Sequence, residues 1–289
     1  MTQTPCRIAS DALELEVSSL GAEMQYLRSS SGKELLWHGD PAFWSGRAPV
    51  LFPIVGRAVD DTVSAGGLSA EMKQHGFARR QEFELVEQTE AMCRHVLHAS
   101  EATRETYPFE FSLSVTHAVA RATLTVTAEV TNEGDTEMPF GLGFHPAFCL
   151  PLAGGDGAHH VTLASGGSPQ RQPLRPDGLL ESTLVEGPFE NGQVEVTDAL
   201  FEEGAWVFPG GAEPVRYGTQ DGPSLAFTFE NLPDLALWRP VGAPFLCVEP
   251  WHGTASCVGD GPEIAQRPNA ILLAPGDSKR FAYHVTFVE

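Results

Sequence analysis

Apolar and polar residues alternate with a period of two over much of this sequence. Leu13, Leu15 and Val17 alternate with Glu14 and Glu16. The same pattern recurs in four further segments, 109–119, 124–130, 225–229 and 281–287. Alternation of this kind is typical of β-strands that bury one face, and no long segment has the periodicity of a helix. We therefore expect an all-β protein.

Clusters of turn-forming residues separate these segments. They contain Gly, Pro, Asn, Asp and Ser, and stand at 30–33, 65–67, 132–135, 154–157 and 275–277. Such clusters typically join neighbouring antiparallel strands. The segment 151–193 is rich in Gly, Pro and Ser, so we expect a long excursion over the surface or the mouth of the fold. No linker divides the composition, and residues 1–289 are predicted to form one large antiparallel domain.

The charge balance argues against two classes of partner. The formal net charge is -20, and only three residues are lysines. A nucleic-acid backbone would be repelled, and so would an anionic membrane surface. No run of about 18 apolar residues is present, so no transmembrane helix is expected.

The cysteines favour a reducing, cytoplasmic location. There are five, an odd number with scattered spacing and no C-x-x-C pair, and the first residues lack the pattern of a signal peptide. No three-ligand metal spacing and no glycine-rich dinucleotide motif occur. His159 and His160 lie in the glycine-rich excursion, where we expect them to be solvated. We expect neither a metal nor an organic cofactor.

Two titratable residues stand in apolar, proline-stiffened surroundings. His145 lies within Gly-Phe-His-Pro-Ala-Phe, and Glu249 lies within Cys-Val-Glu-Pro-Trp-His. Burying an unpaired charge is costly, so such groups usually have a shifted pKa or a specific partner. A general acid and a general base are one interpretation. The alternatives are a core histidine bonded to a backbone carbonyl, and a structural ion pair of Glu249 with Arg57 or Arg239.

Two further polar clusters follow apolar runs. One is the segment 51–57, which ends in Gly-Arg, and the other is 74–79, which contains His75 and Arg79. A β scaffold presents side chains to a cleft in this way. The alternative for His75 and Arg79 is a surface position after a turn.

Seven segments together resemble the aldose 1-epimerase (galactose mutarotase) family, and more narrowly its bacterial branch associated with lactose operons. They are 34–37, 43–44, 49–57, 75–79, 141–148, 245–253 and 273–277. They follow one another in order from about residue 34 to the end, so the resemblance spans nearly the whole chain.

The resemblance implies a large antiparallel β-sandwich of the galactose mutarotase type, with an open cleft for a monosaccharide. It implies interconversion of the α and β anomers of an aldohexose without metal or cofactor. The family's catalytic acid falls on His145 and its catalytic base on Glu249. Its sugar-holding histidine falls on His75. Its sugar-contacting arginine falls on Arg57, with Arg79 as the second candidate.

One position departs from the family pattern. Galactose mutarotases carry an aspartate that holds sugar hydroxyls, between the second histidine and the base. The corresponding region here offers Asp198, Glu202 and Glu203, and the sequence does not choose among them. The preferred sugar is therefore left open, as is the choice between a monomer and a homodimer.

The residue types suit the reaction. A base removes the proton of the anomeric hydroxyl while an acid protonates the ring oxygen, and the two exchange roles on closure. We expect an ionised Glu249 and a protonated His145 on opposite sides of the sugar ring. Two alternatives remain: a hexose-6-phosphate 1-epimerase, which needs a cationic pocket that Arg47, Arg57 and Arg79 could supply, and a non-catalytic carbohydrate-binding or regulatory module on the same fold.

Overall fold

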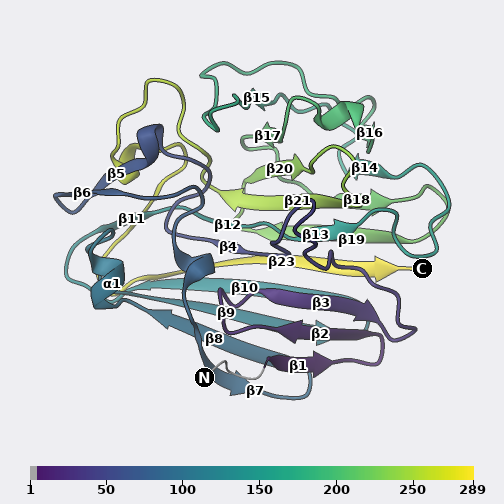
Figure 1. Ribbon diagram of the computed structural model, residues 1–289, viewed down its shortest axis with the longest axis horizontal. Helices are drawn as coiled ribbons and strands as arrows, with labels where there is room; N and C mark the ends of the chain where they lie inside the picture. The colour runs from purple at the N-terminus through teal and green to yellow at the C-terminus, as the bar shows by residue number, and fades with distance from the viewer. Residues whose placement is uncertain (1–4) are drawn as a thin grey trace.

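The computed structural model describes residues 5–289 and is built of antiparallel sheets with little helix (Figure 1). The largest sheet has nine strands. In spatial order they are β16 (Gln193–Glu195), β14 (His160–Leu163), β18 (Val215–Gly218), β19 (Ser224–Glu230), β23 (Ser278–Val288), β10 (Thr123–Asn132), β9 (Phe111–Ala120), β8 (Met92–His98) and β7 (Glu84–Gln88).

A seven-stranded sheet forms the second large element. Its strands are β15 (Gln172–Pro173), β17 (Trp206–Phe208), β20 (Asp234–Trp238), β21 (Phe245–His252), β12 (Leu142–Phe144) and β4 (Val50–Leu51), with β13 (Ala147–Cys149) paired to β21. The two sheets pack face to face. Phe148 of β13 contacts Phe227 of β19 with ring centroids 5.2 Å apart, and Phe144 of β12 contacts Tyr283 of β23 at 4.9 Å. This is the expected sandwich.

Three smaller sheets complete the fold. One consists of β1 (Cys6–Ala9), β2 (Leu13–Val17) and β3 (Met24–Ser29), and β1 and β2 contact β8 and β9 of the large sheet. The others are the pairs β11 (Met138–Phe140) with β22 (Ile271–Leu273), and β5 (Thr62–Ala65) with β6 (Leu68–Glu71).

Helices are few and short in the described part of the chain. They are α1 (Glu101–Arg104) and the 3-10 turns η1 (Val59–Asp61), η2 (Ala78–Arg80), η3 (Ala199–Phe201) and η4 (Ile264–Gln266). None of them has the length and apolar character needed to cross a membrane.

The period-two segments are confirmed as strands. They correspond to β2, β9, β10, β19 and β23. In β9 every second side chain is buried, from Phe111 to Val119, because this face of the sheet packs on the core. In β21 the first seven residues are all buried, since this strand is covered on both faces. Glu249 therefore lies within the protein and not on an exposed face.

The segment 151–193 is irregular, as expected, but it does not leave both of its histidines in solvent. His159 is only 3 % exposed. The backbone N–H of Leu152 donates to Nε2 of His159 (3.0 Å), and Nδ1 of His159 lies 2.9 Å from the carbonyl oxygen of Gly157. The expectation that His159 is solvated is wrong, because the ring holds the glycine-rich loop together.

Candidate active site

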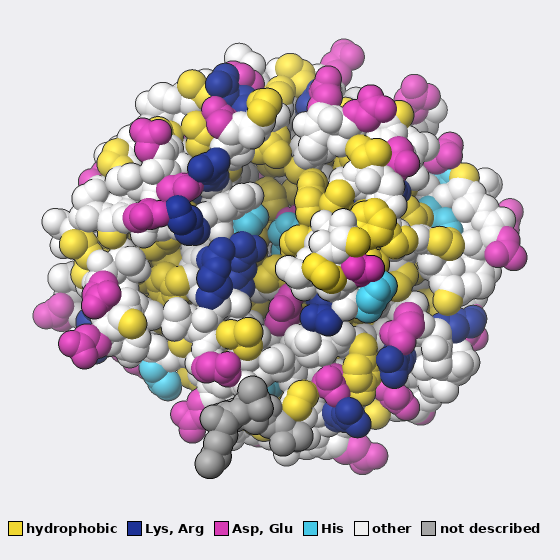
Figure 2. All heavy atoms as spheres, in the orientation of Figure 1, with side chains coloured by type: hydrophobic (Ala, Val, Ile, Leu, Met, Phe, Trp, Pro, Cys, Tyr) yellow, Lys and Arg dark blue, Asp and Glu magenta, His cyan; other side chains and the backbone are white. Residues whose placement is uncertain are grey.

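A pocket of about 330 Å³ opens on the face of the seven-stranded sheet that is turned away from the nine-stranded sheet. Figure 2 shows a hollow in this view of the molecule, with histidine atoms in its floor and Lys and Arg side chains along one side. The volume lies at the lower end of the range for small-molecule sites. Its walls are formed by Trp44, Gly56, Gln74, His75, Arg79, His145, Leu174, Gly178, Leu180, Ala205, Val207, Trp238, Glu249, Trp251 and Ala255.

Glu249 and Trp251 enter this pocket from β21. They are two residues apart and so share one face of the strand. Ala236 of β20 is paired with Glu249, and its small side chain leaves room above the sheet. Glu249 is 1 % exposed, and its Oε2 forms no hydrogen bond within the described part of the chain. A buried carboxyl group without a hydrogen bond calls for a functional explanation.

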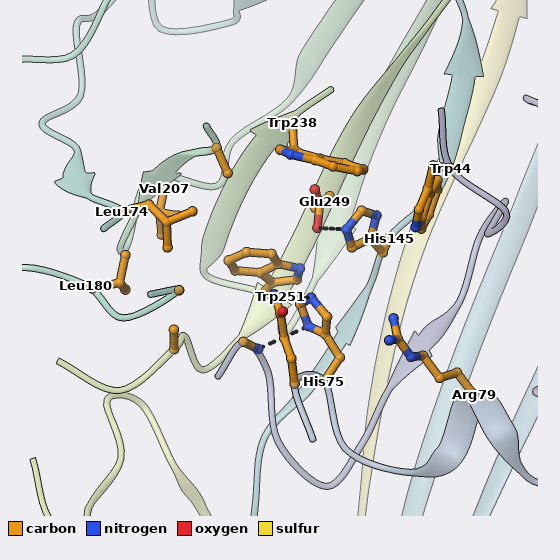
Figure 3. A pocket seen from close by; sticks show the side chains of 15 residues that line it. Trp44, His75, Arg79, His145, Leu174, Leu180, Val207, Trp238, Glu249 and Trp251 are labelled. Carbon is orange, nitrogen blue, oxygen red and sulfur yellow. Dashed lines mark hydrogen bonds and ion pairs between the residues drawn. The ribbon is translucent and has the colours of Figure 1, made fainter. Parts of the chain in front are cut away.

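His145 follows the last residue of β12 and faces Glu249 (Figure 3). Gly143 of β12 is paired with Trp251 of β21, and this pairing brings the two segments together. Nε2 of His145 lies 3.0 Å from Oε2 of Glu249. The backbone N–H of His145 donates to the carbonyl oxygen of Pro49 (3.2 Å), and this bond holds the position of the residue.

Burial shifts the two pKa values in opposite directions. It raises the pKa of Glu249 well above its usual range, and it lowers the pKa of His145 to about 3. Both shifts have the same main cause, since loss of solvent disfavours the charged form of each group. Burial thus favours the neutral form of each group, which is a protonated carboxyl group on Glu249 and an unprotonated imidazole on His145. This differs from the expected ion pair, and the two groups are in direct contact instead of on opposite sides of a sugar-sized space.

His75 lies beside this pair, in the turn between β6 and η2. Its backbone has φ of 68°, and Gly76 after it also has φ of 68°. The backbone N–H of Gly56 donates to Nδ1 of His75 (3.1 Å), so the ring proton is on Nε2. Burial, followed by the charge of His145, lowers the pKa of His75 well below its usual value. His75 is therefore a neutral hydrogen-bond donor at the pocket wall.

The two candidate arginines are placed differently. Arg79 lines the pocket from η2, and its guanidinium forms no hydrogen bond or ion pair with any described residue. Arg57 points elsewhere. It forms a bidentate pair with Asp61 (2.7 and 3.1 Å) and donates to the carbonyl oxygen of Asp177 (2.9 Å). The structure thus does not bring Arg57 to the pocket, because a carboxylate four residues later holds it.

None of the three acidic candidates lines the pocket. Asp198 accepts from Arg239 (2.6 Å) and from the backbone N–H of Gly242 (2.9 Å). Glu202 and Glu203 are exposed. Neither arginine pairs with Glu249, because Arg239 binds Asp198 and Arg57 binds Asp61. The alternative of a structural ion pair at Glu249 is therefore wrong.

Three tryptophans line the pocket together with aliphatic residues, and the sequence did not predict two of them, Trp44 and Trp238, as part of the site. The ring of Trp44 lies 4.8 Å from that of His145, and the ring of Trp238 lies 5.6 Å from it. Trp238 could have been found from the pairing of its strand with β21. Trp251 lines the pocket, and its indole N–H has no partner among the described residues. Phe144 instead packs in the core against Tyr283.

A metal ion could in principle approach this site, since His145, Cys247 and Glu249 each offer a donor atom within 4.8 Å of the others. Burial and the neighbouring Glu249 raise the pKa of the Cys247 thiol well above its usual value. An ion here would also occupy the carboxylate and the imidazole. The arrangement suits proton transfer better than metal binding.

Comparison with known proteins identifies relatives of the whole chain. The family model described as aldose 1-epimerase matches residues 6–286. The plasmid and chromosomal forms of protein LacX from Lactococcus lactis subsp. lactis are each 26% identical over 296 residues, which cover 97% of this chain and 98% of the relative.

Solved structures agree in fold. A galactose mutarotase related enzyme from Lactobacillus acidophilus superposes with a TM-score of 0.93 at 27% identity, covering 99% of this chain and 98% of that one. A galactose mutarotase-like protein from Lactobacillus casei superposes with a TM-score of 0.90 at 28% identity, covering 99% and 100%. These results confirm the fold that the sequence predicted.

Proposed function

Because this chain belongs to the aldose 1-epimerase family, we propose that it interconverts the α and β anomers of an unphosphorylated aldohexose by acid–base opening and closure of the ring. The observation that carries this proposal is the contact of 3.0 Å between Nε2 of His145 and Oε2 of Glu249 in a buried, aromatic pocket. The anomeric hydroxyl and the ring oxygen are bonded to the same carbon. An adjacent acid and base can therefore reach both.

The proton count of the pair fits both halves of the reaction. The proton of the pair first passes from Glu249 to His145 across their 3.0 Å contact. Glu249 then takes the proton of the anomeric hydroxyl while His145 gives its proton to the ring oxygen, and the open-chain aldehyde results. After rotation about the C1–C2 bond, the ring closes on the other face with the roles exchanged. After opening, the pair has a protonated Glu249 and a neutral His145, which is the arrangement that burial favours. Only one proton moves between the two groups, so no external acid or base is needed.

The other polar groups of the pocket can hold the sugar. His75 presents its Nε2–H, which lies 3.2 Å from the side-chain amide of Gln74, and Trp251 presents an indole N–H without a partner among the described residues. Arg79 adds a guanidinium, the only one that lines the pocket among the described residues. Trp44 and Trp238 offer flat apolar faces on which the C–H groups of a pyranose can pack. These contacts would orient the ring over the acid–base pair.

The preference for an unphosphorylated sugar rests on the count of cations. A 6-phosphate dianion requires several donors to overcome the field of a chain with a net charge of -20. Arg57 is held by Asp61, which leaves Arg79 as the arginine at the pocket among residues 5–289. A single guanidinium suits neutral hydroxyl groups better than a dianion.

The test is anomer exchange measured by polarimetry or NMR on freshly dissolved α-glucose, α-galactose and their 6-phosphates. We expect kcat/KM to be higher for the free sugars, with weak inhibition by inorganic phosphate. A clear preference for a phosphorylated sugar that Arg79→Ala abolishes would instead assign a hexose-6-phosphate 1-epimerase. Sugar binding without any rate enhancement would assign a binding module.

A further inference from the structure

A second cluster of buried donor groups lies in the nine-stranded sheet and plays no part in the proposed reaction. Cys93 and His95 share one face of β8, and His117 of β9 is the cross-strand partner of Cys93. One donor atom of each residue lies within 4.8 Å of the other two. The three side chains are at most 2 % exposed.

The two imidazoles of this cluster lack partners. Nδ1 of His95 and Nδ1 of His117 form no hydrogen bond within the described part of the chain. Leaving a buried polar group unsatisfied is unfavourable, and native proteins do so rarely. Two such atoms from adjacent strands, next to a thiol, indicate that a ligand satisfies them.

A fourth donor reaches the cluster from another sheet. Cys6 begins β1, which packs on β8 and β9, and it is 3 % exposed. Its thiol lies near that of Cys93, outside the group of three donor atoms that are within 4.8 Å of one another. The four residues offer two sulfur and two nitrogen donors in an interior from which bulk water is excluded.

We propose that Cys6, Cys93, His95 and His117 form a structural site for one Zn²⁺ ion. Two thiolates and two imidazoles are a common donor set for structural zinc, with bond lengths of about 2.0–2.3 Å. In a tetrahedron those lengths put neighbouring donors about 3.4–3.8 Å apart. For Cys93, His95 and His117, the observed limit of 4.8 Å means that the donor atoms close in by at most about 1.4 Å, and Cys6, which lies outside this group of three, has further to move.

The site would fasten the small sheet to the large one. Cys6 belongs to the sheet of β1, β2 and β3, whereas the other three residues belong to β8 and β9. The ion would thus stabilise the fold without entering the pocket, which lies on the seven-stranded sheet. Sequence patterns could not find this site, because its ligands come from three strands and have no local spacing.

The test uses the full-length protein, first as isolated and then after removal of metals with a chelator. Metal content is measured by mass spectrometry, and the stripped protein is titrated with Co²⁺, which reports thiolate ligation by a charge-transfer absorption band. We expect one equivalent of metal and an intense band. Zn²⁺ at a hundredfold excess over its Kd should raise Tm by about 5 °C or more, while kcat at 25 °C is unchanged.

Matched variants locate the ion. Cys93→Ser should remove the Co²⁺ band, and Cys6→Ser should roughly halve it, whereas Cys247→Ser and the more exposed Cys257→Ser should retain it. His95→Gln provides the same test if Cys93→Ser does not fold. Loss of the band in Cys247→Ser alone would place the ion in the pocket and overturn the proposal. So would a stripped wild-type protein that binds no metal, or a disulfide between Cys6 and Cys93 in the purified protein.

Discussion

The contact between His145 and Glu249 determines what the pocket can do with a proton. Each group is almost fully buried, and each pKa is shifted by loss of solvent toward the neutral form. The pair therefore titrates as a unit with two apparent pKa values. Its singly protonated state is the active one, since either member can then donate while the other accepts.

The pH dependence of kcat/KM follows from these shifts. On the acid side, activity is lost when a second proton binds at His145, whose pKa is lowered from its usual 6.5 to about 3. We therefore expect kcat/KM to stay level as the pH falls from about 7 to about 5. On the alkaline side, activity is lost as Glu249 gives up its proton, at a pKa raised above its usual 4.5. The pH–rate profile of the free sugar checks this. An acid limb with an apparent pKa between 6 and 7 would contradict it.

The two histidines should have separable roles. His145→Ala removes the group that protonates the ring oxygen, so kcat should fall by about 10²–10⁴-fold. His75→Ala removes a neutral donor at the wall and should mainly raise KM. Steady-state kinetics, together with sugar binding by titration calorimetry, distinguish the two effects. The reverse pattern would exchange the two assignments.

The local sequence predicted most of the titratable residues that line the pocket, but it did not predict how they are arranged. His145 and Glu249 were predicted from their apolar neighbours alone. Their direct contact depends on the pairing of β12 with β21, which joins segments about a hundred residues apart and has no local signal. Arg57 was predicted to contact the sugar, but its guanidinium forms an ion pair with the carboxylate of Asp61 instead. Whether Arg79 contacts a sugar stays a prediction.

At the scale of elements, the turn between β6 and η2 positions His75. Gly76 has φ of 68°, and a Cβ atom there would lie 2.2 Å from the carbonyl oxygen of Phe52. Two backbone hydrogen bonds join this turn to the segment after β4. The N–H of His75 donates to the carbonyl oxygen of Gly56 (2.9 Å), and the N–H of Phe77 donates to that of Phe52 (3.0 Å). Only glycine fits at this position without moving the turn.

Gly76→Ala should therefore damage both stability and activity. We expect a loss of at least ~2 kcal/mol in the free energy of unfolding, and a fall of about tenfold or more in kcat/KM of the folded protein. Gly67→Ala is the matched control, since Gly67 has φ of 79° but no atom within 4 Å of its Cβ position. It should cost only about 1 kcal/mol and leave kcat/KM unchanged. Denaturant unfolding and kinetics measure both, and equal behaviour of the two variants would refute the role of this turn.

The long strands could be predicted and the short ones could not. β2, β9, β10, β19 and β23 bury one face, so their residues alternate. β4, β12, β13 and β15 have two or three residues each, too few for a period to be seen. Two of these short strands, β4 and β12, are buried throughout, so no alternation of buried and exposed residues distinguishes them from buried loops.

For the whole molecule, the order of strands was beyond prediction from local patterns. β23 at the end of the chain lies between β10 and β19. More than a hundred residues of sequence separate β23 from its neighbour β10. The resemblance to a known family supplied the architecture that periodicity alone left open. The charge balance, in contrast, is a property of the whole chain that the sequence gives directly.

The net charge of -20 should make stability depend on salt. Repulsion among carboxylates opposes the compact state, and the screening length falls from about 30 Å at 0.01 M to about 8 Å at 0.15 M ionic strength. We expect Tm to rise by a few degrees over this range, in NaCl and KCl alike. The exposed ion pairs weaken in salt but contribute little. A Tm that falls with salt would show that these pairs outweigh the repulsion.

The most direct test of the account is the exchange of magnetisation between the α and β anomeric protons of glucose or galactose, observed by NMR in the presence of the protein. The wild-type protein should transfer saturation between the two signals. Glu249→Gln, which keeps the shape but loses the base, should reduce the exchange rate by at least ~10²-fold. Glu203→Gln, at an exposed position outside the pocket, should match the wild type. Near-normal exchange by Glu249→Gln, or none by the wild type with any aldohexose, would contradict the account.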